Sequence, residues 1–401
     1  MSPSRKAKGL GQQVRIVSSL TRSGSSIGQS DSIVNAIRLR LEDAGHEVRG
    51  VPVVYEDLDG GSEERRSWDA EREEANARYA ASQADALAYI GTLDTDAAPY
   101  SIPITNAAGP LLMISPCNTY PGLTRPFGPG EPDKHYPTGR RNYLRTALTD
   151  DLQGLFAAQW AAELGARRAF VLHDTEPCGR GVALPFADAC RRLGVQLVEE
   201  PVGIVPKQPK YETLARAIAE SGADIVFYGG IIQNGAGPLW RDVRTAAPAI
   251  TMMGPDTLFE HAFIHEAAAD AEGTLITFGG APPALLEGRG RAFYEHYIER
   301  FGREPECYAA SAYDATGVIL QAIERVGRAD RAAITEAAFA TCDFDGALGR
   351  WSFDANGDID LRRGTRLTIR NGHFEPLNVL AIEEDAVEPH VLERVARARQ
   401  L

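Results

Sequence analysis

The sequence predicts an α/β fold with two lobes, each built on a parallel sheet. At 401 residues the chain is too long for one ordinary hydrophobic core. Segments with strand and helix patterns alternate along it in two series, which is typical of parallel sheets with right-handed crossovers. Pro- and Gly-rich stretches at 124–141 and 278–283 interrupt the two series, so we expect the chain to pass between the lobes there.

The first series begins with a strand and a helix that the residue spacing defines well. Residues 14–20 (VRIVSSL) have a strand pattern. Within 31–44, Ile33, Ile37 and Leu41 recur one turn apart, and Gly45 ends the expected helix. Further strands are expected at 48–55, 86–90 and 111–114, and an exposed, strongly charged helix at 62–83.

The second series has five expected strands, at 169–173, 195–201, 224–228, 250–253 and 274–277. Helices are expected at 150–164, 181–193, 211–221, 237–246 and 260–268. Three more helices, 286–301, 308–326 and 331–340, precede closing strands at 349–353 and 366–370. This pattern predicts lobe 1 at 14–141 and 279–361, lobe 2 at 142–278 and 362–385, a leader or expression remnant at 1–13, and a C-terminal tail at 386–401.

Composition and charge limit the partners that we expect. The sequence is 44% hydrophobic and 24% charged, as in soluble globular proteins. Its formal net charge of −13 disfavours binding to nucleic acid or to an anionic membrane surface. No apolar run is long enough for a membrane span. Residues 1–13 lack the apolar core of a signal peptide, so we expect no complete signal sequence in this chain, and the compartment stays open.

The cysteines and histidines predict neither a metal site nor a cofactor site. No CxxC or CxxH spacing occurs. His261 and His265 have the i, i+4 spacing of a zinc pair, but Ala262 stands where the HExxH motif needs Glu, so a solvated helix face is expected. Residues 354–357 (DANG) lack the spacing of a calcium loop and predict a turn.

Disulfide pairing is expected to be limited at most to one bridge. Cys117 and Cys178 fall in different expected lobes, so we predict that they stay unbridged. Cys307 and Cys342 are the only plausible pair, because they would lie at the same end of two antiparallel helices.

Residues 109–124 (GPLLMISPCNTYPGLT) give the strongest indication of a binding site. A short apolar run ends in Ser115-Pro116, and small or hydroxyl-bearing residues follow, namely Cys117, Asn118 and Thr119. Backbone N–H groups and hydroxyls then lie at the C-terminal end of a buried strand, where open α/β sheets bind ligands. The next residue, Tyr120, is a candidate wall of such a site.

The same segment resembles one in the periplasmic binding proteins for branched-chain amino acids, the type 1 solute-binding proteins of ABC importers. Residues 168–179 (RAFVLHDTEPCG), 224–230 (DIVFYGG) and 252–256 (MMGPD) resemble that family in the same order and at similar spacing. The resemblance covers most of residues 14–380. It implies two Rossmann-like lobes joined by a three-strand hinge, the type 1 periplasmic binding protein fold.

The resemblance also implies which residues bind a ligand. Thr95, the backbone of Cys117, and Thr119 take the places where the family holds a carboxylate, while Asp256 takes the place of an acid that faces the ligand's amine. Both threonines have helix N-capping as an alternative role, as has Asp256 before an expected helix at 257–268.

Some candidate positions depart from the family pattern. Cys178 and Ile231 stand where the family commonly has aromatic residues. Asp94 and Asp96 flank Thr95, and their charge would weaken a carboxylate site unless both point to solvent.

These observations predict a binding protein. No catalytic constellation is identifiable, so we expect no enzyme. We expect a periplasmic or extracellular protein, with a lipid anchor before processing as one option, that captures an amino acid or similar carboxylate-bearing ligand between two lobes and delivers it to an ABC permease. A cytosolic or sensor-linked regulator on the same fold, similar to amide sensors, remains the alternative.

Overall fold

The computed structural model describes residues 9–382, which form two compact units. Unit 1 contains the chain up to residue 118, then 122–147 and 283–360. Unit 2 contains 119–121, 148–282 and the chain from 361 onward. Residues 383–385 of the expected lobe 2 and the expected tail at 386–401 lie outside the described residues. The unit boundaries follow residues 118, 121, 147, 282 and 360, whereas the sequence suggested boundaries after 141, 278 and 361.

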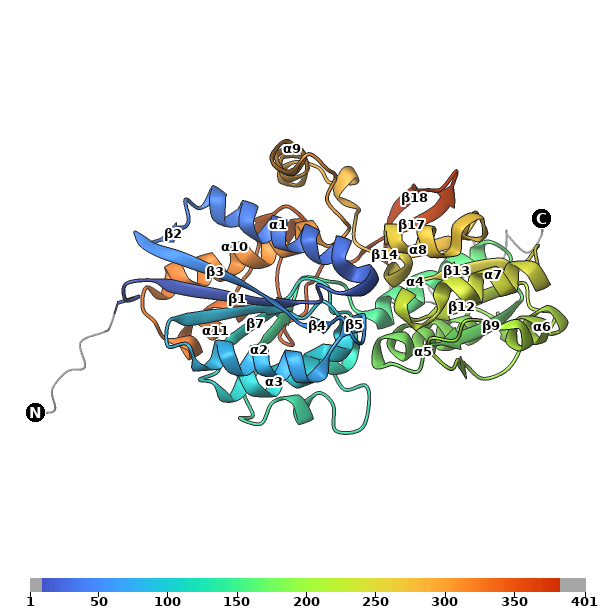
Figure 1. The fold of residues 1–401 in the computed structure, drawn as a ribbon, viewed down its shortest axis with the longest axis horizontal. Helices are drawn as coiled ribbons and strands as arrows, with labels where there is room; N and C mark the ends of the chain where they lie inside the picture. The colour runs from blue at the N-terminus through green and yellow to red at the C-terminus, as the bar shows by residue number, and fades with distance from the viewer. Residues whose placement is uncertain (1–8, 383–401) are drawn as a thin grey trace, which may run out of the picture. The chain divides into compact units, whose positions relative to one another are not determined.

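Unit 1 is built on a six-stranded sheet with the order β2-β3-β1-β6-β7-β8. All neighbouring pairs are parallel except β2 and β3. Helices α1, α10 and α11 pack in a row, while α2 and α3 pack together beside β1, β6 and β7 (Figure 1). The strands and α-helices of unit 1 are β1 (Val14–Leu20), α1 (Ile27–Asp43), β2 (Glu47–Val48), β3 (Val51–Asp59), β4 (Gly61–Ser62), β5 (Ser67–Trp68), α2 (Ala70–Ser82), β6 (Ala86–Gly91), α3 (Ala98–Ala107), β7 (Leu112–Ser115), β8 (Tyr143–Arg145), α9 (Arg289–Phe301), α10 (Ala309–Val326), α11 (Arg331–Phe339), β15 (Phe344–Gly346) and β16 (Gly349–Trp351).

Unit 2 is built on a second sheet with the order β10-β9-β12-β13-β14-β17-β18, and β11 also pairs with β9. Its core pairs are parallel, whereas β17 runs antiparallel to both β14 and β18. Its strands and α-helices are α4 (Asp150–Glu163), β9 (Arg168–His173), α5 (Pro177–Arg192), β10 (Gln196–Leu197), β11 (Val202–Gly203), α6 (Glu212–Glu220), β12 (Ile225–Gly229), α7 (Ala236–Ala246), β13 (Thr251–Gly254), α8 (His261–Ala267), β14 (Leu275–Gly279), β17 (Arg363–Arg370) and β18 (His373–Ala381).

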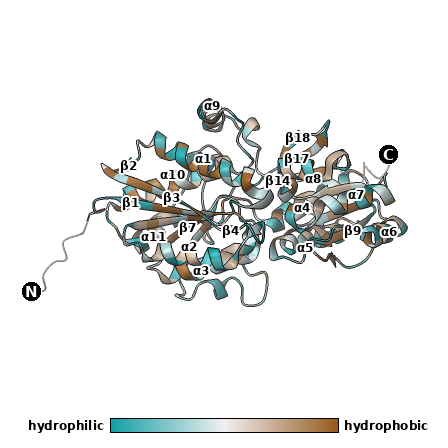
Figure 2. Cartoon of the chain, viewed as in Figure 1, coloured by the Kyte–Doolittle hydropathy of each residue, from teal (hydrophilic) through white to brown (hydrophobic). Residues whose placement is uncertain are grey.

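The alternation of side chains along a strand explains why helices cover both faces of the second sheet. Phe227 of β12 stacks on Phe186 of α5, with ring centroids 4.0 Å apart. The next residue, Tyr228, points to the opposite face and meets Trp240 of α7 at 5.9 Å. Strands buried on both faces are continuously apolar, and the hydrophobic colour in Figure 2 follows the strands accordingly.

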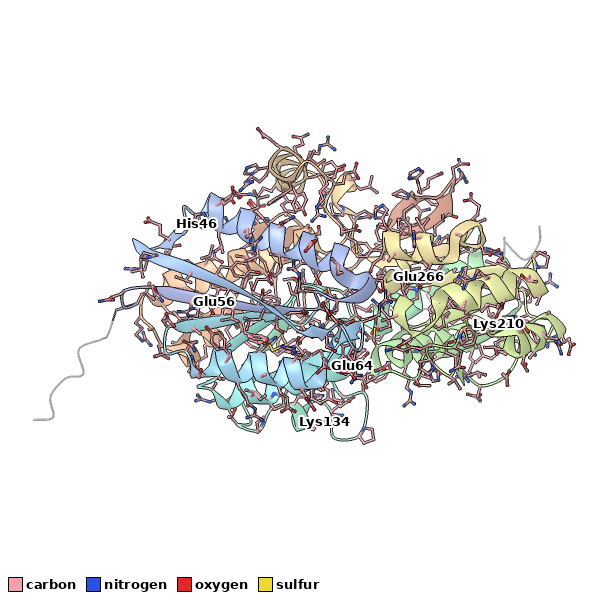
Figure 3. The ribbon with its side chains drawn as sticks, viewed as in Figure 1. His46, Glu56, Glu64, Lys134, Lys210 and Glu266 are labelled. Carbon is pink, nitrogen blue, oxygen red and sulfur yellow. The ribbon has the colours of Figure 1, made fainter. Side chains whose placement is uncertain are left out.

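Charged and polar side chains gather on the outside of each unit. His46, Glu64, Lys134 and Lys210, labelled in Figure 3, are all exposed. The ion pair between Lys210 and Glu212 is exposed as well, and such pairs add little to stability. Within residues 9–382, no helix combines the length and apolar character that crossing a bilayer requires.

Most expected elements are present, and their bounds differ where local signals compete. The helix expected at 62–83 begins only at Ala70, because the Asp69 side chain caps it by accepting from the amides of Glu71 and Arg72. The residues before it form the β4–β5 hairpin instead. Helix α5 begins at Pro177, a residue favoured in the first helical turn, four residues before the expected start.

Four local expectations are wrong or incomplete. The expected strand 349–353 closes neither large sheet, since β16 pairs only with β15. The loop 124–141 lies inside unit 1, not at its boundary, because β8 follows it and pairs with β7. The expected strand 195–201 is replaced by two short strands, β10 and β11, which pair separately with β9. Helix α3 was not expected, since it contains Pro103.

Candidate ligand-binding site

The loop after β7 is held by a side-chain network inside unit 1. The Ser115 hydroxyl oxygen accepts hydrogen bonds from the amides of Cys117 and Asn118, at 3.2 and 2.9 Å. The Asn118 amide group donates to the carbonyls of Thr92 and Leu93, at 2.9 and 3.0 Å. The loops that follow β6 and β7 are thereby tied together at the C-terminal edge of the sheet.

The Asn118 side chain is fully buried and fully engaged within the protein. Besides its two donated bonds, its Oδ1 accepts from the Tyr143 hydroxyl at 2.9 Å. The structure thus gives Asn118 a scaffolding position. Tyr143, its hydrogen-bond partner, is also fully buried.

Thr95 begins a short 3₁₀ turn, η2 (Thr95–Ala97), just after β6, and it is 5% exposed. Its neighbours are not directed to solvent. Asp96 is buried, and Asp94 accepts a hydrogen bond from Thr21 Oγ1 at 2.5 Å. Burial raises the pKa of Asp94 to about 6. Asp94 and Asp96 therefore do not both point to solvent, so their charge is expected to weaken the binding of an anion at Thr95.

Thr119 and Tyr120 belong to unit 2, where they lie against the start of α4 and α5. The Thr119 carbonyl accepts from the amide of Asp150 at 2.9 Å, and its hydroxyl lies 3.9 Å from Cys178 Sγ. Gly181 leaves room for Tyr120, because a Cβ at this position would approach the tyrosine ring to 2.7 Å. Thr119, Tyr120 and Cys178 are thus brought together within one unit.

Cys178, Ile231 and Asp256 follow the C-terminal ends of three adjacent parallel strands, β9, β12 and β13. Thr257 Oγ1 donates to the Gly230 carbonyl at 2.7 Å, which joins the loops that follow β12 and β13. The structure therefore places these three candidates along one edge of the second sheet, the edge at which such sheets bind ligands.

Asp256 is buried, with 4% of its surface exposed, and it opens the 3₁₀ turn η6 (Asp256–Leu258). The alternative of an N-cap before a helix at 257–268 is wrong, because α8 begins only at His261 and follows Glu260. A carboxyl group is thus held at the strand end by a turn that does not continue into a helix.

Asp174, a residue that our sequence analysis did not single out, holds the loop after β12 by hydrogen bonds at this edge. Its carboxylate accepts from the Ile231 amide at 3.0 Å and from Asn234 Nδ2 at 2.8 Å, and it is fully buried. Burial raises its pKa in spite of these bonds. The one available signal was its place immediately after β9.

Arg22 is a second residue that the sequence analysis missed, and it follows the C-terminal end of β1 in unit 1. Its guanidinium pairs with Asp57 at 2.7 Å and with Asp31.

Among residues 9–382, no three His, Cys, Asp or Glu side chains are grouped so as to hold a metal ion.

The structure contains no disulfide among the five cysteines, all of which are described. Cys307 lies near Gln29, with Sγ 3.6 Å from Oε1, whereas Cys342 is exposed and lies near Ser352. The only plausible bridge is therefore not formed. Placement at the same end of α10 and α11 is not enough to form a bridge. Each cysteine lies outside its helix, and its side chain is directed to a different neighbour.

Two α/β units with candidate contacts at their C-terminal strand edges define a protein of the type 1 periplasmic binding class. The chain belongs to the periplasmic binding protein family, whose model matches residues 13–366. An amino acid binding protein of Pseudomonas aeruginosa is 25% identical over 69% of this chain and 70% of its own length.

Solved structures support the same fold. The leucine binding protein LivK of Thermotoga maritima superposes with a TM-score of 0.81, covering 92% of this chain and 99% of its own at 24% identity. An ABC transporter solute-binding protein of Rhodopseudomonas palustris, in complex with p-hydroxybenzoic acid, has a TM-score of 0.78 over 94% and 99% of the two chains at 17% identity.

Proposed function

We propose that this protein is an extracytoplasmic solute-binding protein that captures an amino acid or similar small carboxylate-bearing ligand and delivers it to an ABC permease. Residues of both units are proposed to contact the ligand. On this proposal the protein binds without catalysis and acts in the periplasm or outside the cell. Family membership supports the general role, and the ligand and the permease belong to the proposal.

The placement of Cys178, Ile231 and Asp256 along one edge of the second sheet is the observation that carries the proposal. Parallel α/β sheets bind ligands at this edge because backbone N–H groups and helix starts converge there. In unit 1, Thr95 and the backbone of Cys117 take equivalent places after β6 and β7. We propose that Thr95, Cys117 and Thr119 hold the carboxylate, with the Cys117 amide giving up its 3.2 Å bond to Ser115 Oγ, and that Asp256 faces an amine.

The ligand class follows from the charges at these positions. A buried carboxyl at Asp256 favours a ligand that carries an amine, as in the amino acid and leucine binding relatives. An aromatic acid such as that bound by the Rhodopseudomonas protein carries no cation to pair with this carboxyl and offers only a phenol hydroxyl as a hydrogen-bond donor. Cys178 and Ile231 add small and aliphatic surfaces, which suit an aliphatic side chain.

A thermal-shift screen of amino acids, aliphatic amides and aromatic carboxylates tests the proposal. We expect aliphatic amino acids to raise the unfolding temperature, with about 2.7 kcal/mol of added stability at one hundred times the dissociation constant. Stabilisation by uncharged amides alone would contradict it and favour a sensor-like protein. Stabilisation by aromatic carboxylates alone would keep the binding role and overturn the amine assignment.

A further inference from the structure

A buried arginine at the end of β8 joins two distant segments of unit 1. Arg145 is fully buried, and its Nε donates to Asp358 Oδ1 at 2.6 Å. The Arg145 amide also donates to the Gly357 carbonyl at 3.0 Å. Side chain and backbone therefore both link β8 to the turn at 354–358.

Two more residues complete this network. Thr124 Oγ1 donates to Asp358 Oδ1 at 2.8 Å and also bonds to Arg145. Arg125 Nε lies 2.7 Å from Asp358 Oδ2. Burial alone would raise the pKa of Asp358, but the two arginines lower it below its usual value, so the carboxylate stays ionised.

The same strand reaches the loop that carries candidate ligand contacts. Arg145 Nη1 lies 3.5 Å from the Asn118 carbonyl, and the Tyr143 hydroxyl donates to Asn118 Oδ1 at 2.9 Å. Tyr143 and Arg145 are two residues apart, so they share one face of β8. The amide of Thr146 then donates to the Ser115 carbonyl at 3.0 Å.

The network lies beside the ends of three segments of unit 1. The chain leaves this unit after residues 118, 147 and 360. Asn118 is the first of these ends, Arg145 lies two residues before the end at 147, and Asp358 lies two residues before the end at 360. The Arg145 guanidinium, which belongs to the second segment, thus contacts residues of the other two.

We infer that Arg145 is a positioning residue for ligand binding, which fixes the loop at 115–118 by holding Asp358, Thr124 and Asn118 at once. It acts through the loop and does not itself contact a ligand. Its consequence for affinity rests on the proposed function, in which Cys117 contributes a backbone contact. The planar fork of arginine serves several acceptors in fixed directions, which a lysine ammonium does not reproduce.

Hydrogen exchange of the unliganded protein tests the inference without any ligand. The amides of Cys117 and Asn118 bond to Ser115 Oγ, so their exchange reports opening of this loop. We expect Thr124→Val and Arg145→Lys to speed exchange in a peptide spanning 115–119 by about tenfold or more, the change that ~1.4 kcal/mol produces. Peptides of β6 serve as the internal reference.

Arg331→Lys is the matched control, because Arg331 is a second arginine of unit 1 that bonds to several backbone carbonyls. We expect it to lower the unfolding temperature and leave exchange at 115–119 unchanged. Unchanged exchange at 115–119 in both Thr124→Val and Arg145→Lys would overturn the inference. An exchange rate at 115–119 that rises as much in Arg331→Lys as in these two variants would also overturn it. The milder Thr124→Val decides the question where Arg145→Lys fails to fold.

Calorimetric titration with L-leucine then separates this inference from the proposed function. We expect Thr124→Val to weaken L-leucine binding by about tenfold where the wild type binds it. If Thr124→Val exchanges faster at 115–119 but binds L-leucine with unaltered affinity, the claim that this loop affects ligand binding is overturned. Failure of the wild type to bind L-leucine would count against the proposed ligand only, because the exchange result stands by itself.

Discussion

Ser19 Oγ lies 2.7 Å from Oε1 of Glu73, in the interior of unit 1. The hydroxyls of Ser101 and Tyr89 lie 2.9 and 3.2 Å from the other carboxyl oxygen. Glu73 is 1% exposed, and burial raises its pKa to about 8 although the three hydroxyls lower it. A carboxyl of helix α2 is therefore held in its neutral form at neutral pH.

The raised pKa of Glu73 predicts a loss of stability at alkaline pH. Its contribution is fully present below the ordinary carboxyl pKa of 4.5 and is lost as pH rises through about 8. Glu73→Gln is neutral at every pH. We therefore expect its unfolding temperature to fall less between pH 5 and pH 9 than that of the wild type. Thermal unfolding across this range measures the effect.

Glu64→Gln is the control for this pH dependence, because Glu64 is exposed in the same unit. We expect its unfolding temperature to follow that of the wild type at each pH. Parallel curves for Glu73→Gln and the wild type would show that Glu73 titrates normally in the folded protein.

Arg331 predicts a large stability effect at the ends of two helices. Its guanidinium donates to the carbonyls of Gln83 and Ala108, the residues that directly follow α2 and α3, at 2.5 and 2.8 Å, and to Ala86 at 2.9 Å. A buried carbonyl without its donor costs about 1–3 kcal/mol. We expect Arg331→Lys to lower the unfolding temperature by about 5 °C or more. Arg328→Lys, at an exposed site, should change it little, and equal shifts would argue against a capping role.

Asp256 is expected to affect the choice of ligand more than folding. Asp256→Asn keeps the size of the side chain and removes its charge, so affinity for amine-bearing ligands should fall by about 2 kcal/mol or more. Calorimetric titration with the best amino acid from the thermal-shift screen measures this loss. Asp270→Asn, in the 3₁₀ turn η7 (Ala268–Ala271) of the same unit, is the control. Unchanged affinity with a much less stable unliganded protein would withdraw the amine-site assignment.

The absence of a disulfide predicts a simple thiol count. Denaturation without reductant should expose all five cysteine thiols to reagent. In the folded protein Cys342 should react first, because it is exposed, whereas burial raises the pKa of Cys190 and disfavours its reactive thiolate. A count of three after denaturation would mean that one pair is bridged.

The alternation of strands and helices was predictable because it depends on local signals. Apolar spacing identified β1, α1 and β6 to within a few residues, and Gly45 marked the end of α1. Helix α3 escaped prediction because Pro103 is tolerated inside it, which packing against α2 and β7 allows. The order of the strands also lay beyond local patterns, since pairing joins segments far apart in the chain.

The sequence by itself determined the fold class and the strand ends that carry candidate contacts, such as Thr95 after β6 and Asp256 after β13. The fold class and the strand ends follow from local chemistry, because a buried apolar run that ends in polar residues defines the edge of a sheet. The choice of Thr95 and Asp256 as contacts at those ends came from the resemblance to the periplasmic binding proteins. Only the tertiary structure brought Arg145 to Asp358, 213 residues apart. No periodicity encodes such a pair, since its formation depends on which strands become neighbours and on the burial of a charge that must then find its partner.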